Sequence, residues 1–167
     1  MARVVLALAV SAVLGACRPG SLQFVADHRV RFTSPRDRSL VGAPATITWT
    51  VSGFAPTGLD GRSNRGAGAF AAFVDANPMP VGRDLHWVGR ATKTCKKDPA
   101  CVTPEFLATR NVYVTTASHL HLDVWPAATV VRGRAEHRVI IVLVDGLGRR
   151  IGESAWELDV HTHRSAT

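Results

Sequence analysis

Three residue types are rare in this sequence, and the motifs of common enzyme classes are absent from it. Cysteine, tyrosine and methionine occur three, one and two times among 167 residues. Apolar residues at helical spacing are almost absent, and no serine stands in the G-x-S-x-G turn that exposes a nucleophile. Gly146 and Gly148 lie between two expected strands, whereas a phosphate-binding loop leads from a strand into a helix. We therefore expect a β-protein that is not an enzyme and uses no cofactor.

Acidic residues are also scarce, with 13 aspartates and glutamates against 20 lysines and arginines, so the formal net charge is +7. The basic residues are scattered, and no run of them alternates with aromatic residues as in a nucleic-acid groove. A nucleic acid is therefore not expected as a partner. The charge favours an anionic membrane surface or an anionic wall polymer, and an envelope protein is a further candidate partner. A merely solvated basic surface is the simpler alternative.

The longest apolar run lies at the start of the chain. Residues 4–16, VVLALAVSAVLGA, follow a single Arg3 and are too few to span a bilayer, which is typical of a secretory signal. The run ends in L-G-A-C, which resembles a bacterial lipobox whose cysteine, Cys17, is acylated; the alternative is an ordinary signal in which Cys17 has no role. The predicted organisation is a signal peptide over residues 1–16, a lipidated Cys17 and tether over 17–26, a domain over 27–163 and a disordered tail over 164–167.

With Cys17 assigned to a lipid, Cys95 and Cys101 remain as a pair in an oxidising compartment. The residues between them are KKDPA, in which Asp98-Pro99 favours a turn that brings the two side chains together. A zinc site is the alternative, but C-x5-C lacks a second pair of ligands nearby. We predict a Cys95–Cys101 disulfide.

The stretch that organises the fold is the closing hairpin, residues 136–160. Residues 139–144 are an unbroken run of Val, Ile and Leu, typical of a strand that is central in a sheet or buried on both sides. Residues 145–148 form a glycine-rich reversal. Alternation in the return strand predicts that Trp156 faces the core and that Glu157 faces solvent.

Alternating polar and apolar residues mark the other strands. Trp49 is the expected core aromatic of one strand, and residues 55–68 are expected to be an exposed loop. The count predicts an all-β, antiparallel β-sandwich of about seven to eight strands without a helical segment. The further strands are expected at residues 30–32, 46–51, 70–74, 85–88, 111–116 and 119–124.

The tail of the chain carries a resemblance to a known fold family. Leu120, Leu122 and Trp125, a polar connection, and the run from His137 to Gly148 resemble the last three strands of immunoglobulin-like or fibronectin type III-like bacterial modules. The resemblance covers residues 118–163 and implies an immunoglobulin-like sandwich, but no particular activity. The sequence lacks the Cys…Trp…Cys arrangement of true immunoglobulin domains. In overall style the chain is similar to lipoproteins of high-GC Gram-positive bacteria, which implies export and attachment to the cell membrane.

Two pairs of histidines are candidate metal ligands. Residues two apart on a strand project from the same face, so each pair can offer two imidazoles to Zn²⁺ or Cu²⁺. In an immunoglobulin-like order the two strands concerned usually belong to different sheets, which favours surface histidines over a shared site. The pairs are His119 with His121 and His161 with His163.

Trp87 and Trp125 are candidate contacts for a cell-wall glycan, if they are exposed together. The sequence thus predicts a lipid-anchored, extracytoplasmic binding or structural module of the cell envelope that is not catalytic. Metal binding through the histidine pairs and glycan binding through the tryptophans are the alternatives.

Overall fold

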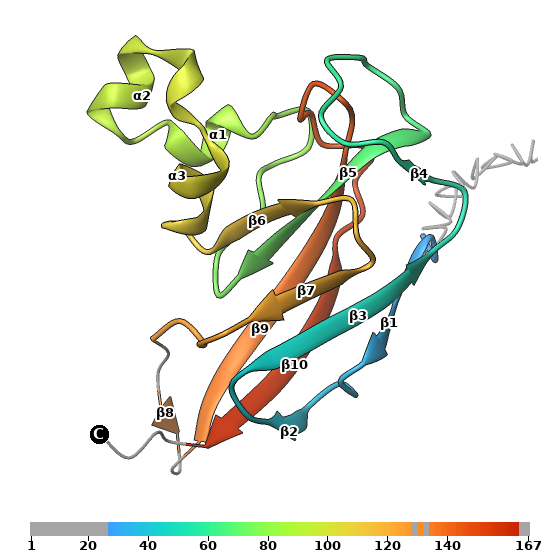
Figure 1. The fold of residues 1–167 in the computed structure, drawn as a ribbon, viewed down its shortest axis with the longest axis vertical. Coiled ribbons are helices and arrows are strands. Elements are labelled where there is room, and N and C mark those ends of the chain that lie inside the picture. The colour runs from blue at the N-terminus through green and yellow to red at the C-terminus, as the bar shows by residue number, and fades with distance from the viewer. Residues whose placement is uncertain (1–26, 128–129, 132–133, 164–167) are drawn as a thin grey trace, which may run out of the picture.

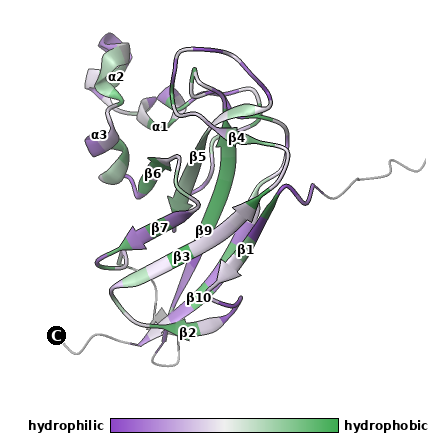
Figure 2. Ribbon diagram, turned by 45° about the vertical axis from the view of Figure 1, so that its right-hand side comes forward, coloured by the Kyte–Doolittle hydropathy of each residue, from purple (hydrophilic) through white to green (hydrophobic). Residues whose placement is uncertain are grey.

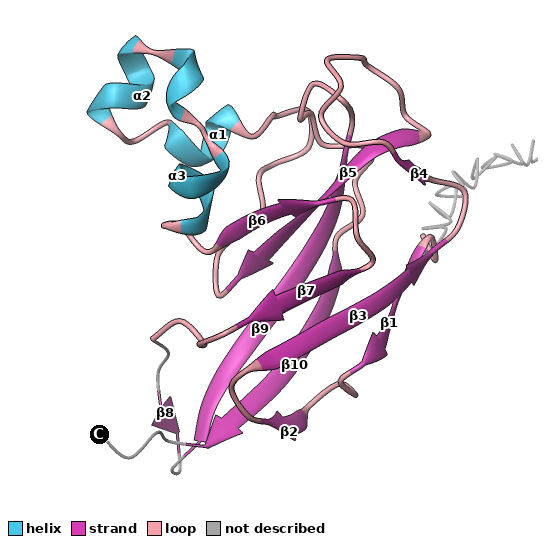
Figure 3. Cartoon of the chain, viewed as in Figure 1, coloured by secondary structure: helices cyan, strands magenta, loops and turns pink. Residues whose placement is uncertain are grey.

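The computed structural model describes residues 27–127, 130–131 and 134–163. The expected signal peptide, Cys17, its tether and the tail lie outside these residues. The described chain is mostly strand with little helix, and its strands form two sheets (Figure 1 and Figure 3). The elements are β1 (Val30–Ser34), β2 (Ser39–Val41), β3 (Ala45–Val51), β4 (Ala55–Pro56), β5 (Ala67–Val74), α1 (His86–Gly89), α2 (Lys93–Lys97), η1 (Pro99–Cys101), α3 (Pro104–Ala108), β6 (Val112–Thr115), β7 (His119–Leu122), β8 (Val130–Val131), β9 (Arg134–Val144) and β10 (Trp156–His163).

The smaller sheet has the order β1-β3-β7, and both of its strand pairs are antiparallel. The larger sheet has the order β2-β10-β9-β5-β4, with β6 also paired to β5 and β8 to β9. Two of its pairs, β2 with β10 and β4 with β5, are parallel. The expectation of a wholly antiparallel fold is therefore wrong for these short edge strands, which are too short for their alternation to be read from the sequence.

Strand β5 and the second half of β9, residues 139–144, form the centre of the larger sheet and are buried on both faces. Their antiparallel register pairs Ala69 with Val144 and Val74 with Val139. Every side chain from Val139 to Val144 is at most 6% exposed, which confirms the prediction of a strand buried on both sides. Alternate side chains of the two strands enter two hydrophobic clusters on opposite faces of the sheet. The first cluster contains Phe70, Ala72, Val74, Val139, Ile141 and Leu143. The second cluster contains Ala69, Ala71, Phe73, Ile140, Val142 and Val144.

The smaller sheet contributes to the first cluster. Ile47 and Trp49 of β3 and Leu120 and Leu122 of β7 are buried there. Trp49 is confirmed as a core aromatic, because its ring meets that of Phe70 edge-on at 5.4 Å between centroids. Figure 2 colours most of β5, and the part of β9 that pairs with it, as hydrophobic, as expected of strands covered on both sides.

The chain from residue 85 to residue 108, which we call the helical segment, contains α1, α2, η1 and α3. Its presence corrects the expectation of a fold without helices. Leu85 and Leu107 of this segment are buried in the second cluster. Residues 85–88, expected to be an edge strand, lead into and form most of α1. Helices of four or five residues are too short to display a helical period in the sequence. None of the helices in the described part of the chain is long and apolar enough to span a membrane.

The closing hairpin has the expected register, with Trp156 opposite Ile141 and Leu158 opposite Val139. Leu158 is fully buried in the first cluster. Trp156 is only half-buried, and its indole Nε1 donates to the carbonyl oxygen of Asp27 at 2.8 Å. This tryptophan therefore packs at the margin of the first cluster and does not fill its centre.

The register of the hairpin can be tested with two neighbouring substitutions. Leu158→Ala removes a buried side chain and should lower the free energy of unfolding by about 2–5 kcal/mol. Glu157→Ala removes an exposed carboxylate 3.8 Å from Arg138 and should change it by less than about 0.5 kcal/mol. Urea denaturation of both variants measures the difference, and losses of equal size would contradict the register.

Candidate functional site

Two distant segments meet beside the reversal of the closing hairpin. Arg150 donates its backbone N–H to the carbonyl of Arg83 at 2.9 Å, and Leu85 donates to the carbonyl of Gly148 at 3.0 Å. Asp84 and Arg149 lie opposite each other in an isolated antiparallel bridge. Leu85 is buried in the second cluster and fixes the position of this pairing on the protein. The charged side chains next to Leu85 are thereby held at the surface.

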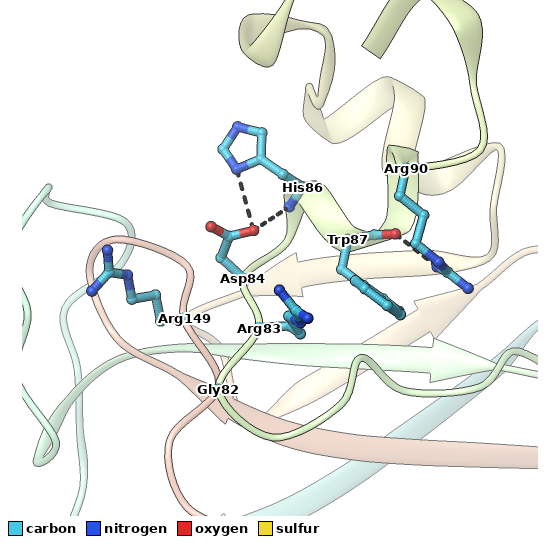
Figure 4. Close-up of a pocket in the computed structure, with 7 residues that line it drawn as sticks. All are labelled: Gly82, Arg83, Asp84, His86, Trp87, Arg90 and Arg149. Atoms are coloured by element: carbon cyan, nitrogen blue, oxygen red, sulfur yellow. Dashed lines mark hydrogen bonds and ion pairs between the residues drawn. The ribbon is translucent and has the colours of Figure 1, made fainter. Parts of the chain in front are cut away.

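A pocket of about 520 Å³ lies over this pairing (Figure 4). Its lining is polar and strongly basic, with three arginines, one aspartate and one histidine beside a tryptophan. We call it the Trp87 pocket, and its residues are Gly82, Arg83, Asp84, His86, Trp87, Arg90 and Arg149.

Trp87 positions two of the arginines. The guanidinium carbon of Arg90 lies 4.1 Å from the indole centroid and that of Arg83 lies 5.0 Å from it, both within the range of cation–π attraction. Arg90 also donates from Nη1 to the carbonyl oxygen of Trp87 at 2.7 Å. Figure 4 shows the indole drawn between the two guanidinium groups. The tryptophan thus fixes two cations that would otherwise repel each other.

Asp84 is the one carboxylate in this lining, and it serves local structure. Its Oδ1 accepts a hydrogen bond from the backbone N–H of His86 at 3.0 Å and lies 3.5 Å from Nδ1 of the same residue (Figure 4). The side chain of Arg149 has no hydrogen bond or ion pair with any described residue. The Trp87 pocket therefore keeps an excess of positive charge.

A second pocket of about 550 Å³ shares Gly82 and Arg149 with the first. We call it the Arg65 pocket, after an exposed arginine of the β4–β5 loop. It is lined by Arg29, Ser63, Arg65, Val81, Gly82, Asp145, Arg149, Arg150, Ile151, Gly152 and Glu153.

Two charges of the Arg65 pocket are already paired or bound. Arg29 donates from Nε to both carboxylate oxygens of Asp27 and from Nη2 to Oδ2, and these hydrogen bonds lower the pKa of Asp27 to about 2, so the pair stays ionised at neutral pH. Asp145 accepts from the Ser63 hydroxyl at 2.9 Å, and its other oxygen accepts from the backbone N–H groups of Leu147 and Arg149. Asp145 thus shapes the hairpin turn, in line with the role expected of an aspartate before glycine.

Arg150 differs from Arg29 and Asp145, because it is partly buried without a carboxylate partner among the described residues. Its guanidinium donates to the carbonyl oxygens of Met79, Glu153 and Ser154 at 2.6–3.2 Å. Burial lowers the pKa of this group below its usual value, and Nε has no partner in the described chain. A cation that is solvated only by neutral carbonyls favours an anion nearby.

The predicted disulfide is confirmed, since Cys95 and Cys101 are bonded with their Cα atoms 5.2 Å apart. It joins α2 to η1 within the helical segment and links no strands. Cys17, the predicted lipidation site, lies outside the described residues.

The structure separates the two histidine pairs. His119 and His121 are exposed on β7 of the smaller sheet, whereas His161 and His163 lie on β10 of the larger sheet. His121 lies 3.4 Å from Asp123 and 3.0 Å from the Thr46 hydroxyl. Across the described ranges no three His, Cys, Asp or Glu side chains lie close enough to hold a metal ion together.

The two candidate tryptophans are also apart. Trp87 packs on the second cluster, while Trp125 packs on the first, stacks on the ring of His137 at 4.7 Å and donates its indole N–H to the carbonyl of Gly42. A platform made of both rings is therefore not formed. Of the two, only Trp87 lines one of the pockets described above.

A buried polar cluster around His137 was missed from the sequence. Nδ1 of His137 lies 2.6 Å from Oδ2 of Asp75, and Nε2 lies 3.2 Å from the Thr162 hydroxyl. Since a carboxylate only accepts hydrogen bonds, Nδ1 carries a proton. Oδ1 of Asp75 accepts from the backbone N–H of Arg138 at 2.8 Å. The sequence held a signal for this cluster. His137 and Val139 are two residues apart on β9, so both side chains point to the same face, toward the first cluster.

No protein-family model matches this chain, and neither a curated protein nor a solved structure matches it.

The cluster around His137 should contribute to stability. Asp75→Ala leaves two N–H groups without an acceptor and should lower the free energy of unfolding by about 1–3 kcal/mol. Asp75→Asn, which retains an acceptor and tolerates the positive φ of 52°, should cost less. The control is Asp123→Ala, whose side chain is 91% exposed and should have almost no effect. Thermal denaturation compares the three, and equal stabilities would contradict a structural role for the cluster.

Proposed function

We propose that this chain is an exported, lipid-anchored binding module of the cell envelope that is not catalytic and that holds an anionic group in the Trp87 pocket. The observation that carries the proposal is the set of three guanidinium groups, from Arg83, Arg90 and Arg149, around a pocket with one carboxylate. Planar guanidinium groups bind carboxylates and phosphates through paired hydrogen bonds. A phosphate or carboxylate of an envelope polymer fits this chemistry.

The geometry favours an anion over a neutral sugar. A sugar that stacks on tryptophan needs an open indole face, whereas both Arg83 and Arg90 lie over the ring of Trp87. The same two contacts hold the guanidinium groups in place before a ligand arrives, which lowers the entropic cost of binding. The two histidine pairs lie in different sheets, so they do not form one shared metal site.

The remaining parts of the proposal rest on the sequence and the fold. The L-G-A-C motif at Cys17 supports lipidation, and the Cys95–Cys101 disulfide fits an oxidising compartment. We propose an immunoglobulin-like sandwich as the fold type, supported by the first cluster, which draws side chains from both sheets. The helical segment and the parallel edge pairs are additions to that plan.

Binding can be tested with two soluble polyanions, poly(glycerol phosphate) and polygalacturonate, by calorimetry on the chain carrying Cys17→Ser. Arg90→Gln should weaken binding of the preferred polyanion by about tenfold, because it removes a charged hydrogen-bond donor. Trp87→Ala should weaken it similarly by releasing both arginines.

Arg36→Gln is the matched control, because Arg36 is an exposed arginine of the β1–β2 turn and lines neither pocket. It removes the same charge and should leave affinity almost unchanged. An equal loss in Arg36→Gln, or no binding of either polyanion, would contradict the proposal.

The lipid anchor is tested by Cys17→Ser in the full chain. The substitution removes the thiol that would carry the lipid, so labelled fatty acid should no longer be incorporated and the protein should leave the membrane fraction. Unchanged labelling and unchanged membrane partition in this variant would refute lipidation at Cys17.

A further inference from the structure

We infer that the ligand is a polymer with anionic groups on successive units, one held in the Trp87 pocket and the next in the Arg65 pocket. This inference rests on the proposed function and extends it from a single anionic group to a repeating chain. It is carried by the arrangement of the two pockets, which are adjacent, share a cation and are both basic.

The two pockets adjoin at Gly82 and Arg149, the two residues that line both. Gly82 has no side chain, and a Cβ added there would meet no atom within 4 Å. A ligand chain can therefore cross above Gly82 without displacing a side chain. Arg149 is exposed and has no ion pair in the described chain, so it can contact anions on either side.

The Arg65 pocket has cations left for a second anion. Arg65 is exposed and forms no ion pair with the described residues, and Arg150 is held only by backbone carbonyls. Asp145 is already bound by three donors, which leaves Glu153 as the exposed carboxylate of the lining. The cations outnumber the carboxylates in this pocket as they do in the first.

The lining also fits the part of a polymer that links its charged groups. Val81, a lining residue of the Arg65 pocket, is 52% exposed. Carbon-rich units, such as glycerol or a sugar ring, can pack on this side chain while their anionic substituents reach the arginines. An isolated small anion would use neither Val81 nor the second set of cations.

The experiment is a length series, because two linked anions that bind two pockets gain affinity from effective concentration. Glycerol-phosphate chains with one, two and six phosphates, and galacturonate chains with matching numbers of carboxylates, are titrated calorimetrically into the Cys17→Ser chain. In the preferred series the longest chain should bind about a hundredfold or more tightly than the single unit, well beyond the statistical gain. The series that binds identifies the anion as phosphate or carboxylate.

Variants separate this inference from the proposed function. Arg65→Gln should lower the ratio of long-chain to single-unit affinity by about tenfold, whereas Arg36→Gln should preserve it. A ratio no larger than the number of anionic groups, or a ratio that Arg65→Gln does not change, would overturn the inference while the effect of Arg90→Gln still supports a single-anion site. Absence of binding by every chain would overturn both.

Discussion

The burial of β5 and of the second half of β9 on both faces is the constraint on which the rest of the structure depends. Val139 to Val144 send alternate side chains to opposite faces, and all of them are apolar, so neither face can be left to water. One face is covered with the help of the smaller sheet, through Trp49 and its neighbours. The other is covered in part by the helical segment, through Leu85 and Leu107. The central pair of strands is therefore covered by a sheet on one face and partly by short helices on the other.

The candidate site results from the way the helical segment covers the second cluster. The chain must pass from the end of β5 over the second cluster, and Leu85 anchors that passage. Where it crosses the reversal of the closing hairpin, backbone hydrogen bonds join Arg83 to Arg150 and Leu85 to Gly148. Side chains between these anchors cannot enter the core, so they gather at the surface. Arg83 and Arg149 belong to this stretch, and Trp87 and Arg90 follow within α1 and at its end.

Much of the fold could be predicted from the sequence, because alternation is a local signal. The strands around Trp49 and Leu120, and the long run of β9, all lie where the pattern placed them. The short helices could not be found from a period, although Thr103-Pro104 carries the capping signal of α3. The parallel pairing of β2 with β10 joins segments more than a hundred residues apart, and no local pattern encodes it.

The candidate site was less predictable, because it too depends on contacts between residues far apart in the sequence. Trp87 was identified as a candidate, but as a stacking surface for sugars, since the sequence does not show that Arg83 and Arg90 lie over its ring. Arg149 and Arg65 looked like scattered surface charges until nonlocal contacts placed them around shared pockets.

The position of the proposed anchor adds a constraint on the ligand. Arg29 lines the Arg65 pocket, and Asp27 beside it is the first described residue. If Cys17 carries a lipid, nine residues lie between it and Asp27, and the ten Cα–Cα steps of an extended chain span at most about 35 Å. The Arg65 pocket is then tethered close to the membrane surface. For a module anchored in this way, a polymer lying along the membrane would be at high local concentration near both pockets, so binding would not require high affinity at either pocket alone.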